Sequence, residues 1–170
     1  MGLISAELSA KLDEIMGKCF AINRMLDRGM SLLAVRWKLS KTAEIMHPRI
    51  AHAYTGDLFG DFVSTYKNAR DVESIYPATP VGDRDYDSPL DFFYDYHKEN
   101  LELQEMIEDA VDEAAEEGDL TTKKAMNKML ENLIPFTELS QTLIDVFTKF
   151  NGDDFQRQMF DSVVEKYINV

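Results

Sequence analysis

Apolar residues recur every three or four positions along most of this 170-residue chain. This is the spacing of a buried face on an α-helix. One such stripe begins at Leu8 and continues to Trp37, and similar stripes return throughout the rest of the sequence. The spacing predicts five helices, over about 5–39, 46–70, 89–117, 121–150 and 153–168.

Residues 71–88 lack helical rhythm and separate the second predicted helix from the third. A connection of this length is too long for a tight turn but can cross a whole bundle. Ser88 and Pro89 suit the first turn of the third helix, and Gly118 suits its end. We therefore predict a single all-α domain over residues 1–170. Its expected architecture is a four-helix bundle of two antiparallel hairpins joined by a long crossover, with a short C-terminal helix.

The net charge of −13 is distributed unevenly along the chain. Residues 1–70 contain ten Lys and Arg against seven Asp and Glu, a balance of +3, whereas residues 71–170 contain eight against 24, a balance of −16. Binding to duplex DNA depends on cationic side chains that neutralise phosphates, so direct DNA binding is not expected. The acidic part suits either solubility or the attraction of cations toward a site.

Cys19 is the only cysteine, which excludes an intramolecular disulfide framework. A lone cysteine among apolar helix positions is typical of a small core residue, although a further role for Cys19 stays open. No run approaches the roughly 20 apolar residues that span a bilayer, and the N-terminal residues lack the pattern of a signal peptide. We expect a soluble, cytoplasmic protein.

The sequence contains no Gly-rich phosphate loop, no GxSxG motif and no CxxC motif, but residues 101–147 carry a more specific pattern. The predicted third helix ends in an acidic stretch that is followed by a D-x-x-T turn, Asp119 to Thr122. Arg36-Trp37 and Met46-His47 stand about ten residues apart in the first hairpin. Together these features resemble the Dps-like (DNA-protecting mini-ferritin) branch of the ferritin-like superfamily. The resemblance implies a bundle that forms a homo-oligomer, with iron storage and stress response as the associated functions.

The resemblance also implies where an iron-oxidising centre should lie. Its ligands in that branch are two His and three acids contributed across a dimer interface. The corresponding positions in this chain are Arg36, His47, Ala51, Phe62 and Tyr66. Four of the five expected ligands are therefore replaced, and the guanidinium group of Arg36 would repel a ferrous ion.

A rearranged metal site is the alternative, with His47, His52, Asp57 and Asp61 as candidate ligands for iron. Asp57 and Asp61 are spaced i,i+4, but they begin ten residues after His47, where the acids of the family begin fifteen after it. Five residues rotate a helical face by about 140°, so this pair cannot adopt the same geometry in an unbroken helix. The two Asp can equally form a solvated helical face. His52 and His97 each lack an accompanying Glu-x-x-His motif.

The connection contains a second acidic cluster. Asp83, Asp85 and Asp87 alternate along the chain, as in the first part of a calcium-binding EF-hand loop. Ser88 stands where that loop needs Gly, and Tyr94 stands where it needs a bidentate Glu. An EF-hand is therefore not expected, and weak divalent-ion binding at the surface stays an alternative.

Three functional hypotheses follow. The favoured one is a Dps-like or ferritin-like oligomer that has lost its iron-oxidising centre and serves in storage, binding or scaffolding. The second is an active iron-oxidising storage protein that uses the rearranged site. The third is a metal-free helical interaction module.

Overall fold

The computed structural model describes residues 4–50, 54, 84–150, 160–162 and 164. Its helices are α1 (Ala6–Ser31), the π-helix η1 (Leu32–Arg36), α2 (Ser40–Ile50), α5 (Pro89–Glu117) and α6 (Leu120–Phe150). These elements confirm the all-α expectation. Most of the predicted second helix and of the crossover lies outside the described residues. Within the predicted C-terminal helix, residues 160–162 and 164 are helical.

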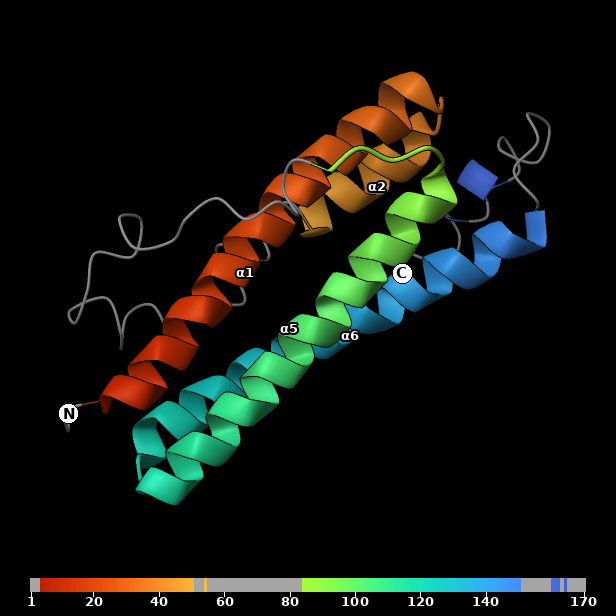
Figure 1. The fold of residues 1–170 in the computed structure, drawn as a ribbon. Helices are drawn as coiled ribbons and strands as arrows, with labels where there is room; N and C mark the ends of the chain where they lie inside the picture. Colours follow the sequence, from red (N-terminus) through yellow and green to blue (C-terminus); the bar gives the residue numbers. More distant parts are fainter. Residues whose placement is uncertain (1–3, 51–53, 55–83, 151–159, 163, 165–170) are drawn as a thin grey trace.

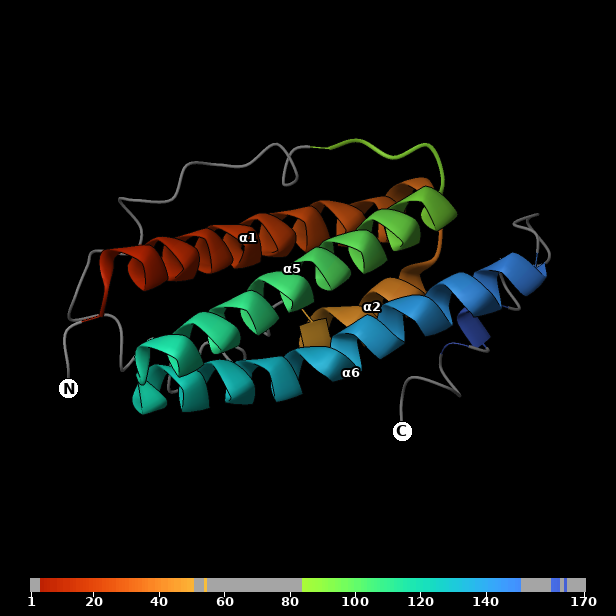
Figure 2. The ribbon, with the colours of Figure 1, turned by 60° about the horizontal axis from the view of Figure 1, so that its bottom comes forward.

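The axes of the long helices are roughly aligned, as the two views of the ribbon show (Figures 1 and 2). Helices α5 and α6 form an antiparallel hairpin, and α1 packs along α5. Tyr54 reaches α6, where its ring centre lies 5.7 Å from that of Phe136. No helix in the described part of the chain is long and apolar enough to cross a membrane.

Local sequence signals set several helix ends. Ser88 caps α5 by accepting a hydrogen bond from the backbone N–H of Asp91 at 3.1 Å, and Pro89 follows in the first turn. Gly118 ends α5 in the left-handed conformation, with φ of 72°. The carboxylate of Asp119 then accepts from both the N–H and the hydroxyl of Thr122. The cap at Ser88, the stop at Gly118 and the D-x-x-T turn are thus confirmed.

The end of α1 corrects the expected boundaries of the first hairpin. The first helix was expected to continue to 39 and the second to begin at 46. Instead, a π-turn ends the first helix at Arg36, Lys38 adopts a left-handed φ of 56°, and α2 begins at Ser40. Trp37 and Leu39 are buried within the turn itself, so the apolar rhythm continues where the helix does not. Pro48 consequently lies inside α2 instead of near its start.

Replacing Lys38 by glycine is expected to increase the stability of the protein. Lys38 is exposed and holds a left-handed backbone conformation that costs a residue with a Cβ roughly 1–2 kcal/mol. Lys38→Gly removes that cost, but it also increases the conformational entropy of the unfolded chain, which opposes folding. We therefore expect a net gain of up to about 1 kcal/mol in the free energy of unfolding. Urea denaturation measures it. Lys38→Ala is the control and should leave stability nearly unchanged; an equal gain in both variants would contradict the explanation.

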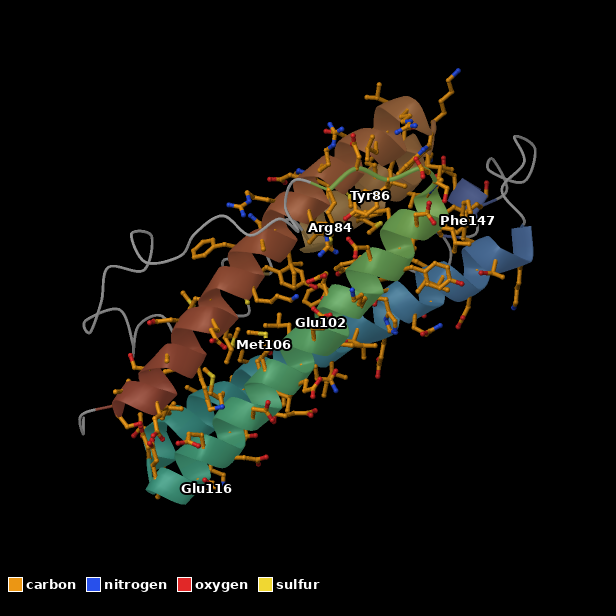
Figure 3. All side chains as sticks on the ribbon, viewed as in Figure 1. Arg84, Tyr86, Glu102, Met106, Glu116 and Phe147 are labelled. Atoms are coloured by element: carbon orange, nitrogen blue, oxygen red, sulfur yellow. The ribbon has the colours of Figure 1, made fainter. Side chains whose placement is uncertain are left out.

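The core is rich in aromatic rings. Phe93 of α5 packs edge-on against Phe147 of α6, with ring centres 5.8 Å apart, and both rings contact Phe160. Figure 3 shows Phe147 beside the C-terminal segment. Gly29 of α1 lies directly against the ring of Phe92, so the first hairpin approaches α5 very closely at this point. Cys19 is fully buried, and this burial raises the pKa of its thiol.

Candidate functional site

A charged cluster lies between α1 and α5. Glu99 is only 1% exposed although it carries a carboxylate. Lys18 of α1 pairs with Glu99, and its Nζ also donates to Oε2 of Glu102 at 2.6 Å. Figure 3 shows Glu102 on the side of α5 that faces α1. One ammonium group is thus held by two carboxylates that stand one helical turn apart.

Arg84, at the entrance to α5, reaches the same carboxylate from the outside. Its Nη1 lies 2.6 Å from Oδ1 of Asp95 and 3.2 Å from Oε1 of Glu99. The hydroxyl of Tyr86 donates to the other oxygen of Asp95 at 2.6 Å. Glu99 therefore lies between two protein cations, Lys18 on the α1 side and Arg84 at the surface.

Charges and hydrogen bonds within the cluster stabilise the ionised forms of Lys18, Arg84 and Glu102. Burial alone lowers the pKa of Lys18, but the hydrogen bonds and charges of Glu102 and Glu99 outweigh it and leave the pKa raised. The hydrogen bond from Lys18 lowers the pKa of Glu102 against a smaller effect of burial. For Arg84, burial acts downward while the carboxylates of Asp95 and Glu99 raise the pKa overall. The cluster is therefore a set of mutually stabilised ion pairs.

A neutral hydrogen-bond network continues the cluster into the interior. The hydroxyl of Tyr54 donates to Oδ1 of Asn100 and lies 3.1 Å from the hydroxyl of Tyr96. Nδ2 of Asn100 approaches Oγ of Ser140 at 3.5 Å. Burial raises the pKa of Tyr96 to about 12, so this phenol is neutral at physiological pH. The network joins α5, α6 and residue 54 without adding a charge.

His97 lies at the outer end of this hydrogen-bond network. Its Nδ1 lies 2.7 Å from Oγ of Ser140, and that hydroxyl donates to the carbonyl of Thr137 at 2.8 Å. Because a serine hydroxyl has a single proton, His97 must be the donor to Ser140. His97 is therefore a half-buried histidine whose Nδ1 is satisfied within the fold.

Of the expected ligand positions in the first hairpin, Arg36 and His47 lie among the described residues. Arg36 is exposed and donates to the carbonyl oxygen of Tyr86 at 3.1 Å, and His47 is exposed on α2. The other positions of interest lie outside the described residues: Ala51, His52, Asp57, Asp61, Phe62 and Tyr66.

One member of the acidic cluster Asp83, Asp85 and Asp87 forms an ion pair within the fold. Asp83 lies outside the described residues, but Asp85 pairs with Arg28 of α1 at 2.5 Å. This hydrogen bond and the charge of Arg28 lower the pKa of Asp85. Asp85 thus helps to attach the end of the crossover to α1.

One group of three carboxylates in the described residues is close enough to share a cation. Ligand atoms of Glu7, Glu113 and Glu117 all lie within 4.8 Å of one another, where α1 begins and α5 ends. Ser5 also donates to Glu117. The pKa of Glu113 is raised, by burial and then by the charges of Glu117 and Glu7. The group is solvent-facing, and exposed acids repel one another in this way with or without a bound ion.

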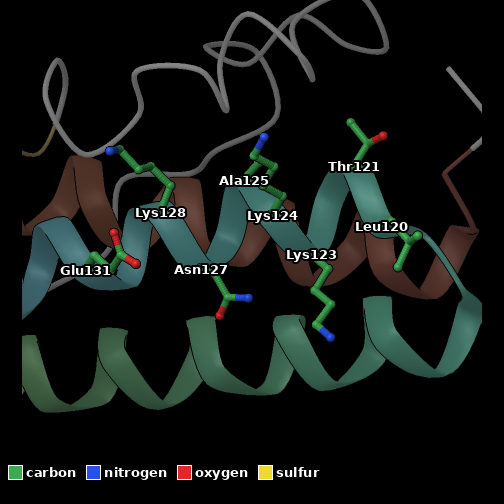
Figure 4. A pocket seen from close by; sticks show the side chains of 8 residues that line it. All are labelled: Leu120, Thr121, Lys123, Lys124, Ala125, Asn127, Lys128 and Glu131. Carbon is green, nitrogen blue, oxygen red and sulfur yellow. The ribbon is translucent and has the colours of Figure 1, made fainter.

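A basic groove lies along the first turns of α6. It has a volume of about 920 Å³ and is lined by Lys123, Lys124 and Lys128, among others. In Figure 4, Lys124 and Lys128 extend to one side of α6 and Lys123 to the other. The groove contrasts with the acidic charge of the chain.

Sequence reasoning missed the charged cluster and the neutral network, although a signal was present. Glu99 and Asn100 stand between Tyr96 and Leu103, at the i+3 and i+4 positions of the apolar stripe of α5. Lys18 lies between Ile15 and Ile22 on α1 in the same manner. A polar residue on a buried stripe needs a partner, and that requirement could have identified all three.

The helix order and the packing of the two hairpins define an all-α protein with a ferritin-like fold. The fold is shown by a solved structure of Archaeoglobus fulgidus ferritin engineered into a closed form by site-directed mutagenesis. The match has a TM-score of 0.71 and 16% sequence identity, and it covers 95% of this chain and 96% of that one. No protein-family model matches the sequence, and no curated protein is significantly similar to it.

Proposed function

We propose that this protein is an oligomeric, ferritin-like bundle of the Dps-like type that no longer oxidises iron at its centre and serves in storage, binding or scaffolding. The single observation that carries the proposal is that the carboxylate of Glu99 is buried and paired with cations of the protein itself. It is the one buried carboxylate among the described residues, and Lys18 and Arg84 already neutralise it.

Among the described residues, the donor set at the bundle centre does not fit a di-iron site. Such sites in ferritin-like proteins take a Glu from each of two helices and a Glu-x-x-His motif from each of the other two. Here α1 contributes Lys18, α6 contributes Ser140, and the predicted second helix, in the first hairpin, contributes Tyr54. The carboxylates of this cluster thus come from α5 alone, and the other described elements supply a cation and neutral hydroxyls where a di-iron site needs carboxylates from several helices. The Dps-like ligand positions support the same proposal, because Arg36 brings a further positive charge.

Oxygen consumption during ferrous loading tests the loss of the centre. We expect the purified protein to consume oxygen no faster than the same iron solution without protein. Oxygen uptake in proportion to the number of chains would overturn the proposal and favour an active site built from His47, His52, Asp57 and Asp61. Iron that binds without oxygen uptake would favour a storage role at acidic surfaces.

Native mass spectrometry tests the oligomeric part of the proposal. A closed assembly of many subunits would support a ferritin-like shell, because closed symmetry is the usual form of soluble homo-oligomers. A monomer or a simple dimer would favour the metal-free interaction module instead. A gel-shift titration completes the test, and we expect only weak binding to DNA at physiological salt.

A further inference from the structure

The contact between Lys18 and α5 differs from an ordinary surface ion pair. Glu99 and Glu102 stand one helical turn apart and direct an oxygen each at the same Nζ atom. The side chain of Lys18 is 14% exposed and that of Glu99 only 1%. An isolated charge at such depth costs several kcal/mol, so the carboxylates require a positive charge at this point.

We infer that Glu99 and Glu102 form a cation-binding cage whose occupant is the ammonium group of Lys18, so that this tethered charge stands where a divalent metal ion would otherwise bind. The inference rests on the proposed function, since it names what replaces the metal. It also assigns a ligand class to the cage, namely a small divalent cation with a preference for oxygen ligands.

The charge balance supports the inference. Among the described side chains, Asp95, Glu99 and Glu102 contribute three negative charges to the cluster. Lys18, Arg84 and Lys98 contribute three positive charges, since Nζ of Lys98 lies 3.9 Å from Glu102. The sum is zero. Changing Lys18 to a carboxylate changes the sum by two negative charges, which one divalent ion restores to neutrality.

Side-chain length supports it as well. A glutamate side chain places its carboxylate oxygens about where a lysine places Cε, one bond short of Nζ. A small divalent cation held at about 2 Å from that oxygen, the usual distance for oxygen ligands, would lie close to the position of Nζ and slightly beyond it. Glu102 Oε2 is already 2.6 Å from the same point. Lys18→Glu should therefore convert the cage into a metal site without moving the backbone.

Thermal unfolding with and without Mn²⁺ tests the inference in the full-length chain. We expect Lys18→Glu to be destabilised in a chelator and its Tm to rise by about 5–10 °C when Mn²⁺ exceeds its Kd about 100-fold. The wild-type protein should show no comparable rise. Lys18→Gln is the matched control, because it has the same length as Glu without the charge, and we expect a much smaller shift. The double variant Lys18→Glu/Glu99→Gln should lose most of the rise.

The outcomes separate this inference from the proposed function. Equal shifts in Lys18→Glu and Lys18→Gln, or an undiminished shift in the double variant, would overturn the cage. If Lys18→Glu does not fold even with Mn²⁺, Lys18→Ala gives the answer, because it removes the ammonium without adding a charge. A Mn²⁺ shift above wild type in Lys18→Ala supports the cage, and no shift overturns it. Iron oxidation by the wild-type protein would overturn only the proposed function.

Discussion

Replacing Lys18 by methionine is expected to lower the free energy of unfolding by about 3 kcal/mol, because it leaves Glu99 as a buried carboxylate with only part of its compensation. Losing one partner of a buried ion pair typically costs about 3–5 kcal/mol. We choose the lower end because Arg84 still lies 3.2 Å from Glu99. Urea denaturation at neutral pH measures the change, and the Tm should fall by roughly 6–12 °C.

The double variant Lys18→Met/Glu99→Leu is the decisive control. Replacing both members of a buried ion pair by apolar residues of similar volume is often neutral or stabilising. We expect the double variant to return to within about 1 kcal/mol of the wild-type stability. A double variant as unstable as Lys18→Met would show that Lys18 stabilises the fold through packing and not through its charge.

The pH dependence of the same comparison has a definite sign. The raised pKa of Lys18 means that its contribution is present below the ordinary value of 10.5 and is lost as the pH rises through the raised pKa. The lowered pKa of Glu102 means that its contribution is present above 4.5 and is lost as the pH falls through the lowered pKa. The stability difference between wild type and Lys18→Met should therefore be largest between these limits.

Gly29→Ala is expected to lower the free energy of unfolding by about 2–3 kcal/mol, against the usual effect of this substitution in a helix. Alanine normally stabilises a helix interior by roughly 1 kcal/mol relative to glycine. Here a Cβ at position 29 would overlap Cε2 and Cζ of Phe92. That ring is fully buried and packs against Tyr86 and Phe93, with centres 5.3 and 5.8 Å away, so it has little room to move.

A double-mutant cycle with Phe92→Leu identifies the cause. The smaller side chain should make room for the methyl group, so Gly29→Ala should cost clearly less in the Phe92→Leu background than in the wild type. Additive effects would show that the two sites do not interact. A Gly29→Ala variant that is as stable as the wild type would contradict the close approach of α1 to α5.

The helices of this protein follow from local information. Apolar spacing marks α5 and α6, and Ser88 and Gly118 mark the two ends of α5 through interactions within a few residues. Local reasoning failed at Lys38, because Trp37 and Leu39 continue the apolar rhythm through a reversal of the chain. The spacing of apolar residues indicates which residues are buried, and a buried turn can show the same spacing as a buried helix.

The sequence by itself therefore determined the helical class and the second hairpin with its caps, because each depends on residue types and on short-range spacing. Only the tertiary structure decided what lies between α1 and α5. Lys18 and Glu99 are 81 positions apart in the chain, and no local rule pairs them. Their contact depends on how α1 lies along α5. Close packing excludes water there, so each buried charge must find its partner within the fold.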